Sequence, residues 1–363
     1  MIFFSYPKAG FEKYSSEIKE AIDGVLNSGT YIKGESLKNF ENNFSHYLGC
    51  KFGLGVANGT DSIFLSLKAI GVKEDDEVLT VSHTATGTVA AIVHTGASPV
   101  FLDIKEETMN LDSSKIENSI TKKTKAIIAV HLYGQACDMD PILDISKKYG
   151  IPVIEDCAQA AGAEYKGNKV GSMGVAGCFS FFPTKNLSGY GDGGFVATSD
   201  KDIYQKIIAM REYGWDEKRN AFTFGINSRL DEMQAAVLDV KLSHLEEDNE
   251  ERIRAANFYL KNIKNDLITL PICIEHSKHV YHLFVVKIVR RDDFINHLKD
   301  FDIVAGIHYP NPVHQHSYYQ KFLKKSTLPL TDKTSKEIVS IPIYQGIKQE
   351  ELDKVVSIIN KFV

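Results

Sequence analysis

Lys185 has the setting of a lysine that reacts with a carbonyl group. It lies in "CFSFFPTKNLSGYGDGGFVAT", between an aromatic run and a glycine-rich turn. Partial loss of hydration disfavours an ammonium ion, so the pKa of such a lysine falls and its free amine can attack a carbonyl carbon. Imine formation with an aldehyde cofactor is a common use of that reactivity. The alternative is a lysine whose stem packs on the aromatic residues while its charge stays in water.

Asp156 is the second candidate, in "VIEDCAQAAG", where it ends an apolar run that predicts a strand. Ligands of open α/β sheets bind at the carboxyl ends of the strands. A carboxylate there can pair with a ring nitrogen of a ligand and keep that nitrogen protonated. Gln159 is near enough in sequence to orient the same ligand. A solvated acid at a strand end is the alternative interpretation.

A third motif suits a phosphate group. In "VANGTDSIFLSL", Gly59, Thr60, Asp61 and Ser62 lie between a predicted strand and a predicted helix. Backbone N–H groups at a helix N-terminus bind anions, and a hydroxyl beside them adds a further donor. The same residue types are favoured at the N-cap of any helix. Both interpretations stay open at this point.

The turn "SGYGDGG" matches the dinucleotide-binding pattern G-x-G-x-x-G through Gly189, Gly191 and Gly194. That pattern needs a helix to begin at the glycines, whereas "GFVATS" predicts a strand. We therefore reject a nicotinamide site. The glycines are expected to let the backbone turn tightly beside Lys185.

Two further segments carry polar residues. In "GIHYPNPVHQHSYY", prolines separate His308, His314 and His316, so no regular helix can place them on one face. No acidic ligand is near them in the sequence, and we interpret the segment as a polar, aromatic substrate loop rather than a zinc site. In "FGINSRLDEMQAA", Asn227 and Arg229 stand before a predicted helix. Arg229 could clamp an anion or be a solvated charge.

Alternating strands and helices must position these residues. Several of the predicted strands are almost continuously apolar, as in a parallel sheet covered on both faces, and the alternation predicts an open α/β sheet. A long helical region over 231–261 leads to a smaller second domain. The predicted strands are 52–57, 76–82, 98–104, 125–134, 151–158 and 194–199, and the predicted helices are 14–26, 37–47, 61–70, 86–96, 139–150 and 350–363; the second domain contains 281–289.

Length and composition limit the class of protein. A chain of 363 residues exceeds one comfortable core, so we expect two domains, 1–245 and 246–363. The net charge of −5 offers no general attraction for nucleic acid or an anionic membrane surface. No run approaches the ~18 apolar residues that span a bilayer. The five cysteines are an odd number and widely spaced, which favours a reducing cytoplasm over a disulfide framework.

Taken in order along the chain, the motifs resemble one known family. "NGTDS", "EDCAQAAGA", "SFFPTKNLSGYGDGG", "GINSR", "HLFVV" and "GIHYPNPVHQHSYY" are similar to those of the pyridoxal-phosphate sugar aminotransferases of the DegT/DnrJ/EryC1/StrS type, over nearly the whole chain. The resemblance implies the aspartate aminotransferase fold (fold type I), in which a large, mostly parallel α/β domain precedes a smaller α+β C-terminal domain. It also implies a homodimer with active sites at the subunit interface.

The resemblance assigns roles by position. Lys185 would form the Schiff base with pyridoxal 5'-phosphate and then move protons, and Asp156 would pair with the pyridine nitrogen and make the ring an electron sink. Gln159 would lie by the 3-hydroxyl. The residues implied to hold the phosphate are Gly59, Thr60, Ser180 and, from the partner subunit, Asn227; those implied near the sugar nucleotide are His308, Tyr309 and His314.

One position departs from the family pattern. Many relatives carry an aromatic residue that stacks on the cofactor ring in a "TF" or "TW" pair, whereas this chain has Thr84 and Ala85 there. His83 could supply the flat surface instead, and we hypothesise that it stacks on the pyridine ring. A related branch of dehydratases has histidine at the lysine position; the presence of Lys185 favours transamination.

The implied reaction has two halves. L-glutamate gives its amino group to the cofactor, and a nucleotide-linked keto-sugar then accepts it. The segments "SHTATGTVAAI" and "HYPNPVHQHSYY" look most like members that aminate carbon 3 of dTDP-linked 3-keto-6-deoxyhexoses. Amination at carbon 4, as in perosamine- or bacillosamine-type pathways, is the alternative. A regulator that keeps the fold without catalysis would need no lysine–aspartate pair, and this chain has both.

Overall fold

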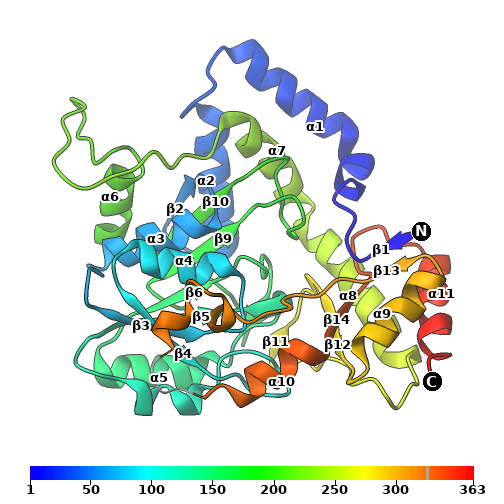
Figure 1. The fold of residues 1–363 in the computed structure, drawn as a ribbon. Coiled ribbons are helices and arrows are strands. Elements are labelled where there is room, and N and C mark those ends of the chain that lie inside the picture. Colours follow the sequence, from blue (N-terminus) through cyan, green and yellow to red (C-terminus); the bar gives the residue numbers. More distant parts are fainter. Residues whose placement is uncertain (324–326) are drawn as a thin grey trace.

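The computed structural model describes residues 1–323 and 327–363, and its centre is a seven-stranded sheet (Figure 1). The strand order is β2-β10-β9-β6-β5-β3-β4. All neighbouring pairs are parallel except those of β10, which is antiparallel to both β2 and β9. The bounds are β2 Phe52–Val56, β3 Glu77–Val81, β4 Ser98–Leu102, β5 Thr124–Val130, β6 Val153–Asp156, β9 Ala176–Ser180 and β10 Gly194–Thr198.

Helices cover the sheet, and both the predicted fold class and the predicted alternation of strands and helices are confirmed. The central strands β5 and β6 are buried on both faces except for Lys125, which explains their continuous apolar runs. The helices of this part are α1 Ala9–Ser28, α2 Glu35–Leu48, α3 Gly59–Ala69, α4 Thr86–His94, α5 Met139–Tyr149, α6 Lys201–Met210 and α7 Glu232–Ser243.

The predicted helical region 231–261 is two helices rather than one. Helix α7 ends at Ser243 and α8 (Leu245–Asn262) begins after His244, whose φ of −107° and ψ of −1° differ from the ideal helical values. The His244 ring stacks on Tyr14 of α1 at 3.9 Å between centroids and bonds Glu17 at 3.0 Å. Packing against α1 accounts for a break that the apolar periodicity does not reveal.

The C-terminal part has its own hydrophobic cluster. The cluster draws on residues from Ala255 to Phe362 and on Ile2 from the other end of the chain. Ile2 belongs to β1, which pairs in parallel with β13, so the N-terminal strand lies with the C-terminal part (Figure 1). The proposed boundary at 245/246 remains a prediction. The elements here are β1 Ile2–Phe3, β12 Phe284–Lys287, β13 Ile303–Val304, β14 Ile338–Ile341, α9 Arg291–Asp300, α10 Pro329–Glu337 and α11 Gln349–Ile359.

A three-stranded antiparallel sheet lies apart from the central one, with β7 between β8 and β11. Short 3-10 turns complete the chain, among them Leu132–Gly134 after β5 and Val313–Gln315 in the histidine-rich loop. Within the described residues, no helix combines the length and apolar character of a membrane span. The strands of the small sheet are β7 Glu164–Tyr165, β8 Asn168–Lys169 and β11 Ser277–Lys278.

Candidate active site

The predicted site residues come together at the carboxyl edge of the central sheet. Asp156 ends β6, Ser180 ends β9, and Lys185 lies in the loop that follows β9. His83 comes two residues after β3, and Gly59 begins α3 shortly after β2. Parallel strands deliver their carboxyl ends to one side of a sheet, so segments far apart in the sequence meet there.

Lys185 has the electrostatic setting of a reactive amine. Burial lowers its pKa to about 8, and the Asp156 carboxylate partly opposes that shift. In the part of the chain that the structure describes, its Nζ makes no hydrogen bond or ion pair within 4.0 Å. The ammonium form is therefore weakly stabilised, and the neutral amine is populated closer to neutral pH than in an ordinary lysine. The solvated-lysine alternative does not fit this setting.

Asp156 is buried, with only 5% of its surface exposed. Its Oδ2 accepts a hydrogen bond from Thr88 Oγ1 at 2.7 Å, and its Oδ1 accepts one from the Ala158 N–H at 3.1 Å. Burial raises the pKa of the carboxyl group, and these two bonds oppose the shift only in part. A buried carboxylate with few donors is stabilised by a cation placed beside it. The solvated-acid alternative is thereby excluded for this residue.

The start of α3 forms a cradle for an anion. Asn58 caps the helix by accepting the Asp61 N–H at 2.8 Å, while the N–H groups of Gly59 and Thr60 have no acceptor among the described residues. A Cβ on Gly59 would come within 2.8 Å of Ser180 Cβ, so glycine lets the end of β9 approach the helix closely. The free N–H groups and two nearby hydroxyls suit a phosphate.

A chain of hydrogen bonds links three of the predicted residues through Tyr133. Its N–H donates to Gln159 Oε1 at 2.7 Å, and its hydroxyl donates to the His308 carbonyl oxygen. Gln159 Nε2 in turn donates to Tyr309 Oη at 3.0 Å. Tyr133 was not predicted from the sequence. The sequence does contain an indication of its place: "HLYGQ" follows the apolar strand β5 directly and must therefore reach the same sheet edge.

The same chain of bonds determines the protonation of His83. Its Nε2 lies 2.8 Å from Tyr133 Oη, and because the tyrosine proton goes to the His308 carbonyl, Nε2 must be the donor. The His83 Nδ1 is then an acceptor, and it is buried without a hydrogen-bond partner. Burial lowers the pKa of His83 to about 4, so the ring is neutral at pH 7. Stacking of this ring on a cofactor remains a hypothesis.

The three histidines of the substrate loop are separated. His308 Nδ1 bonds Ser340 Oγ at 2.9 Å, and burial with the Lys185 charge lowers its pKa to about 4. His314 is buried, with Nδ1 bonded to Ser82 Oγ at 2.7 Å and Nε2 3.2 Å from Asp332. His316 is half-buried, and its Nε2 lies 3.2 Å from the Asn311 carbonyl oxygen. His314 thus has both ring nitrogens engaged by the protein, which leaves its predicted substrate contact without support from the geometry.

Asn227 lies at the surface, and its neighbours tie the segment to α3. Ser228 Oγ donates to Asp61 Oδ2 at 2.7 Å and accepts the Ala57 N–H at 3.0 Å. Arg229 lies 3.6 Å from Glu212 and is partly exposed, so its charge is already paired within the chain. The exposed Asn227 side chain is free of hydrogen bonds to the described residues.

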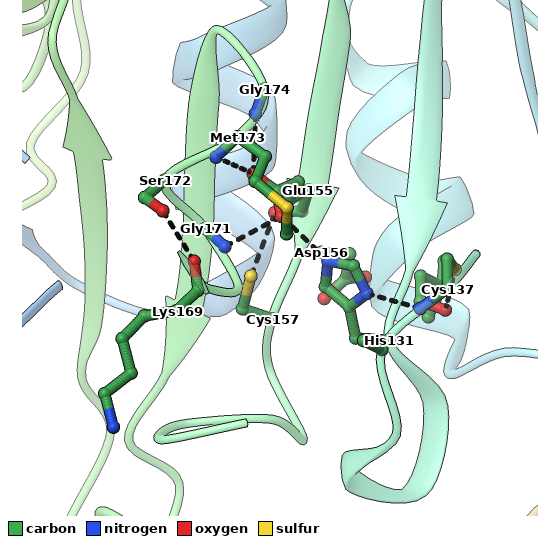
Figure 2. A network of polar contacts seen from close by, with 12 residues as sticks. His131, Cys137, Glu155, Asp156, Cys157, Lys169, Gly171, Ser172, Met173 and Gly174 are labelled. Carbon is green, nitrogen blue, oxygen red and sulfur yellow. Dashed lines mark hydrogen bonds and ion pairs between the residues drawn. The ribbon is translucent and has the colours of Figure 1, made fainter. Parts of the chain in front are cut away.

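The neighbour of Asp156 on β6 serves a different region, which Figure 2 shows. Glu155 is fully buried on the other face of the strand. Its Oε1 accepts the N–H groups of Met173 and Gly174 at 2.8 and 2.7 Å, and its Oε2 accepts Gly171 N–H at 2.8 Å and His131 Nε2 at 3.0 Å. This carboxylate is saturated and holds the 171–174 turn.

The chain was compared with known families and proteins. The model of the DegT/DnrJ/EryC1/StrS aminotransferase family matches residues 12–360. A dTDP-3-amino-3,6-dideoxy-alpha-D-galactopyranose transaminase of Aneurinibacillus thermoaerophilus is 44% identical over 350 residues, 96% of either chain. A pleiotropic regulatory protein of Geobacillus stearothermophilus is 40% identical and covers 97% of this chain and 96% of its own. The structure of S. venezuelae DesV with a ketimine intermediate aligns with a TM-score of 0.97 at 36% identity, over 100% of this chain and 99% of that one.

Proposed function

Because the chain belongs to the DegT/DnrJ/EryC1/StrS aminotransferase family, we propose that it moves the amino group of L-glutamate to a nucleotide-linked keto-sugar. The sugar is a dTDP-3-keto-6-deoxyhexose and the product its 3-amino-3,6-dideoxy form. The observation that carries the proposal is that Lys185, whose pKa is lowered to about 8, and the buried Asp156 lie at the same edge of the sheet.

The residues at this edge fit pyridoxal 5'-phosphate. The unpartnered N–H groups of Gly59 and Thr60 and the nearby Ser180 suit its phosphate. Asp156, buried with two donors, suits a protonated ring nitrogen. When bound, the cofactor supplies a ring that accepts the electron pair released at the substrate carbon.

The residues of the chain supply the rest. Asp156 holds the proton on the ring nitrogen, and Thr88 keeps its Oδ2 oriented through the 2.7 Å bond. Lys185, whose amine lies at this edge of the sheet, would accept and return the proton at the substrate carbon. The Gln159 amide is held by its bonds to Tyr133 and Tyr309, and it would orient the 3-hydroxyl of the cofactor. His83 is neutral and can lie against the ring without placing a second charge there.

A homodimer with shared active sites is part of the proposal. The segment after α6 extends away from the body of the molecule (Figure 1) and exposes Phe222 and Phe224, at 64% and 50%. Phe182, beside the Lys185 loop, is 50% exposed as well. Large exposed apolar side chains favour burial by a second copy. Asn227, three residues after Phe224, would then reach the phosphate bound by the partner subunit. Sedimentation analysis across protein concentrations checks the dimer.

Carbon 3 is preferred over carbon 4 because the A. thermoaerophilus relative is named for a 3-amino sugar. The G. stearothermophilus relative, named as a regulatory protein, keeps the regulator open as a second candidate. A regulator needs no reactive amine, so the lowered pKa of Lys185 favours the enzyme. The five cysteines are all free thiols, consistent with the proposed cytoplasmic location.

The test separates these candidates. The purified protein is loaded with pyridoxal phosphate, and L-glutamate is added while the visible absorbance is followed. We expect the absorbance to bleach and 2-oxoglutarate to appear; an unchanged spectrum supports the regulator. A panel of dTDP- and UDP-linked 3-keto and 4-keto sugars, followed by mass spectrometry, then identifies the acceptor. NMR of the product assigns the carbon that carries the new amine.

A further inference from the structure

The loop that carries Lys185 is held from behind by the two helices α7 and α8. The loop itself makes few backbone bonds: Lys185 N–H donates to Phe182 O at 2.8 Å, and Gly189 N–H donates to Phe181 O at 2.8 Å. Between these bonds, the Ser188 carbonyl oxygen accepts a side-chain hydrogen bond from another element, and the Asn186 side chain bonds to α8. The position of Lys185 is therefore only as well defined as the backbone of this loop.

Lys241 of α7 makes the first of the contacts that fix the loop. Its Nζ donates to the Ser188 carbonyl oxygen at 2.8 Å and to Ser188 Oγ at 3.0 Å, and it lies 4.5 Å from the centroid of the Tyr190 ring. No other donor reaches the Ser188 carbonyl within the described part of the chain. Only 5% of Lys241 is exposed, and no carboxylate of the described residues lies within ion-pair distance of it.

A buried ammonium without a carboxylate partner is costly, and an apolar side chain of similar volume avoids that cost. Burial indeed lowers the pKa of Lys241 to about 8. The one thing that lysine supplies here, and methionine does not, is a pair of donors that reach across to Ser188.

Two amide side chains on the same helices hold the flanks of the loop. Gln234, two turns before Lys241, accepts the Tyr190 N–H at 2.7 Å. Asn249 of α8 accepts from Asn186 Nδ2 at 2.7 Å and donates to the Ala161 carbonyl at 3.0 Å. Asn186 is the residue directly after Lys185, so these contacts hold the loop on the C-terminal side of the reactive lysine.

We propose that Gln234, Lys241 and Asn249, together the Lys185 clamp, are positioning residues that hold the reactive amine of Lys185 in its partly dehydrated place. None of the three is hydrogen-bonded to Lys185 itself. They act through Ser188, Tyr190 and Asn186. This inference rests on the proposed function, because it takes Lys185 as the reacting group.

The experiment measures the loop directly, in the full-length protein. Hydrogen exchange of the backbone over 182–191 is followed by mass spectrometry. The pH midpoint at which Lys185 reacts with acetic anhydride is measured on the same samples before cofactor is added. In Lys241→Met we expect exchange over 182–191 to rise about tenfold, because a charge-assisted hydrogen bond is lost. The labelling midpoint should rise by roughly one pH unit as the amine becomes hydrated.

Two matched comparisons keep the test decisive if Lys241→Met folds poorly. Gln234→Leu removes the acceptor of the Tyr190 N–H and should raise exchange of that amide, whereas Gln234→Glu retains the acceptor oxygen and should not. Glu232→Gln is the control: Glu232 is buried on the same helix but accepts Gly34, Ser36 and Leu37 N–H groups of α2 at 2.6, 3.0 and 3.1 Å. It should loosen 34–37 and leave 182–191 unchanged.

The proposal is overturned if Lys241→Met and Gln234→Leu both keep wild-type exchange and the wild-type labelling midpoint. It is equally overturned if Glu232→Gln changes 182–191 as much as Lys241→Met does, because the effect would then be general destabilisation. Failure of the proposed function looks different: wild-type protein with bound pyridoxal phosphate would show no bleaching with glutamate, while exchange over 182–191 would still report on the clamp.

Discussion

Glu155 and Asp156 are adjacent on β6 and both are buried. They face opposite sides of the sheet and differ in the number of hydrogen bonds that their carboxylates accept. Four donors surround Glu155, three of them backbone N–H groups of the 171–174 turn (Figure 2). Two donors reach Asp156. Burial acts to raise the pKa of both carboxyls, but His131 and the backbone bonds bring that of Glu155 below its usual value, whereas that of Asp156 stays raised.

This difference separates a structural carboxylate from a functional one. A buried carboxylate that already accepts its full set of hydrogen bonds is not stabilised further by a ligand. One that accepts few hydrogen bonds is stabilised by a cation bound beside it. The same holds for the two lysines with lowered pKa values: Lys241 donates to Ser188, whereas Lys185 Nζ has no acceptor among the described residues. In each pair, the residue with fewer hydrogen bonds inside the protein, Asp156 or Lys185, is the one assigned to the active site.

The largest effect is expected at Lys185. In Lys185→Ala, transamination should fall below detection, because the amine that reacts and moves the proton is gone. The melting temperature should stay near that of the wild type, since no hydrogen bond of Lys185 Nζ is lost. Glutamate-dependent bleaching and a thermal melt measure the two properties, and full retained turnover would refute the assigned role.

Asp156→Asn should retain the fold and lose most of the rate. An amide cannot keep the ring nitrogen protonated, so we expect turnover to fall about 10²–10⁴-fold, the range typical of a lost proton-holding group. Steady-state kinetics with glutamate measures the rate. An Asp156→Asn protein with wild-type turnover would remove the distinction between the two carboxylates.

Glu155→Gln should lose stability and retain its turnover. Its amide NH₂ would face backbone donors in the 171–174 turn, and removal of one member of a buried pair typically costs about 3 kcal/mol. Urea unfolding of the protein without cofactor measures that loss. The turnover per folded molecule should remain close to that of the wild type, in contrast to Asp156→Asn.

Stability should depend on pH with opposite sign for the two residues in protein without cofactor. The folded pKa of Asp156 is raised above 3.8, so wild-type protein should lose stability relative to Asp156→Asn as the pH rises above about 4. The folded pKa of Glu155 is lowered below 4.5, so the advantage of wild type over Glu155→Gln should shrink as the pH falls below that value. Urea midpoints at pH 3.5, 5 and 7 (approximate settings) test both signs.

The smallest effect is expected at Thr88, whose hydroxyl donates to Asp156 Oδ2. Thr88→Val removes one neutral-to-charged bond, and we expect turnover to fall roughly fivefold, which corresponds to about 1 kcal/mol. Thr84→Val is the matched control, because Thr84 Oγ1 lies 2.8 Å from Thr88 Oγ1 and does not itself bond Asp156. Equal effects of the two variants would indicate a disturbed α4 rather than a lost bond.

Much of this arrangement could be predicted from the sequence, because it depends on local patterns. Apolar runs followed by polar residues identify strand ends, and parallel strands bring those ends together, so Asp156, Lys185 and the Gly59 turn were expected at one edge. The alternation of strands and helices likewise predicts the sheet, because each element buries a face of its own.

What the sequence could not predict depends on contacts between distant segments. The hydroxyl of Thr88, the backbone bonds of Tyr133 and the break at His244 each involve a partner from another element, and no local period encodes that partner. The same reason explains His314. Its residue type fits a substrate loop, but its bonds to Ser82 and Asp332 are apparent only in three dimensions.

The pairing of β1 with β13 has a consequence for synthesis on the ribosome. The central sheet uses residues 52–198, so it can close while the C-terminal third of the chain is still being translated. The C-terminal cluster instead joins Ile2 with residues as far along the chain as Phe362. Strand β1 must therefore stay without its partner strand until Ile303 and Val304 have been made, long after the residues of the central sheet.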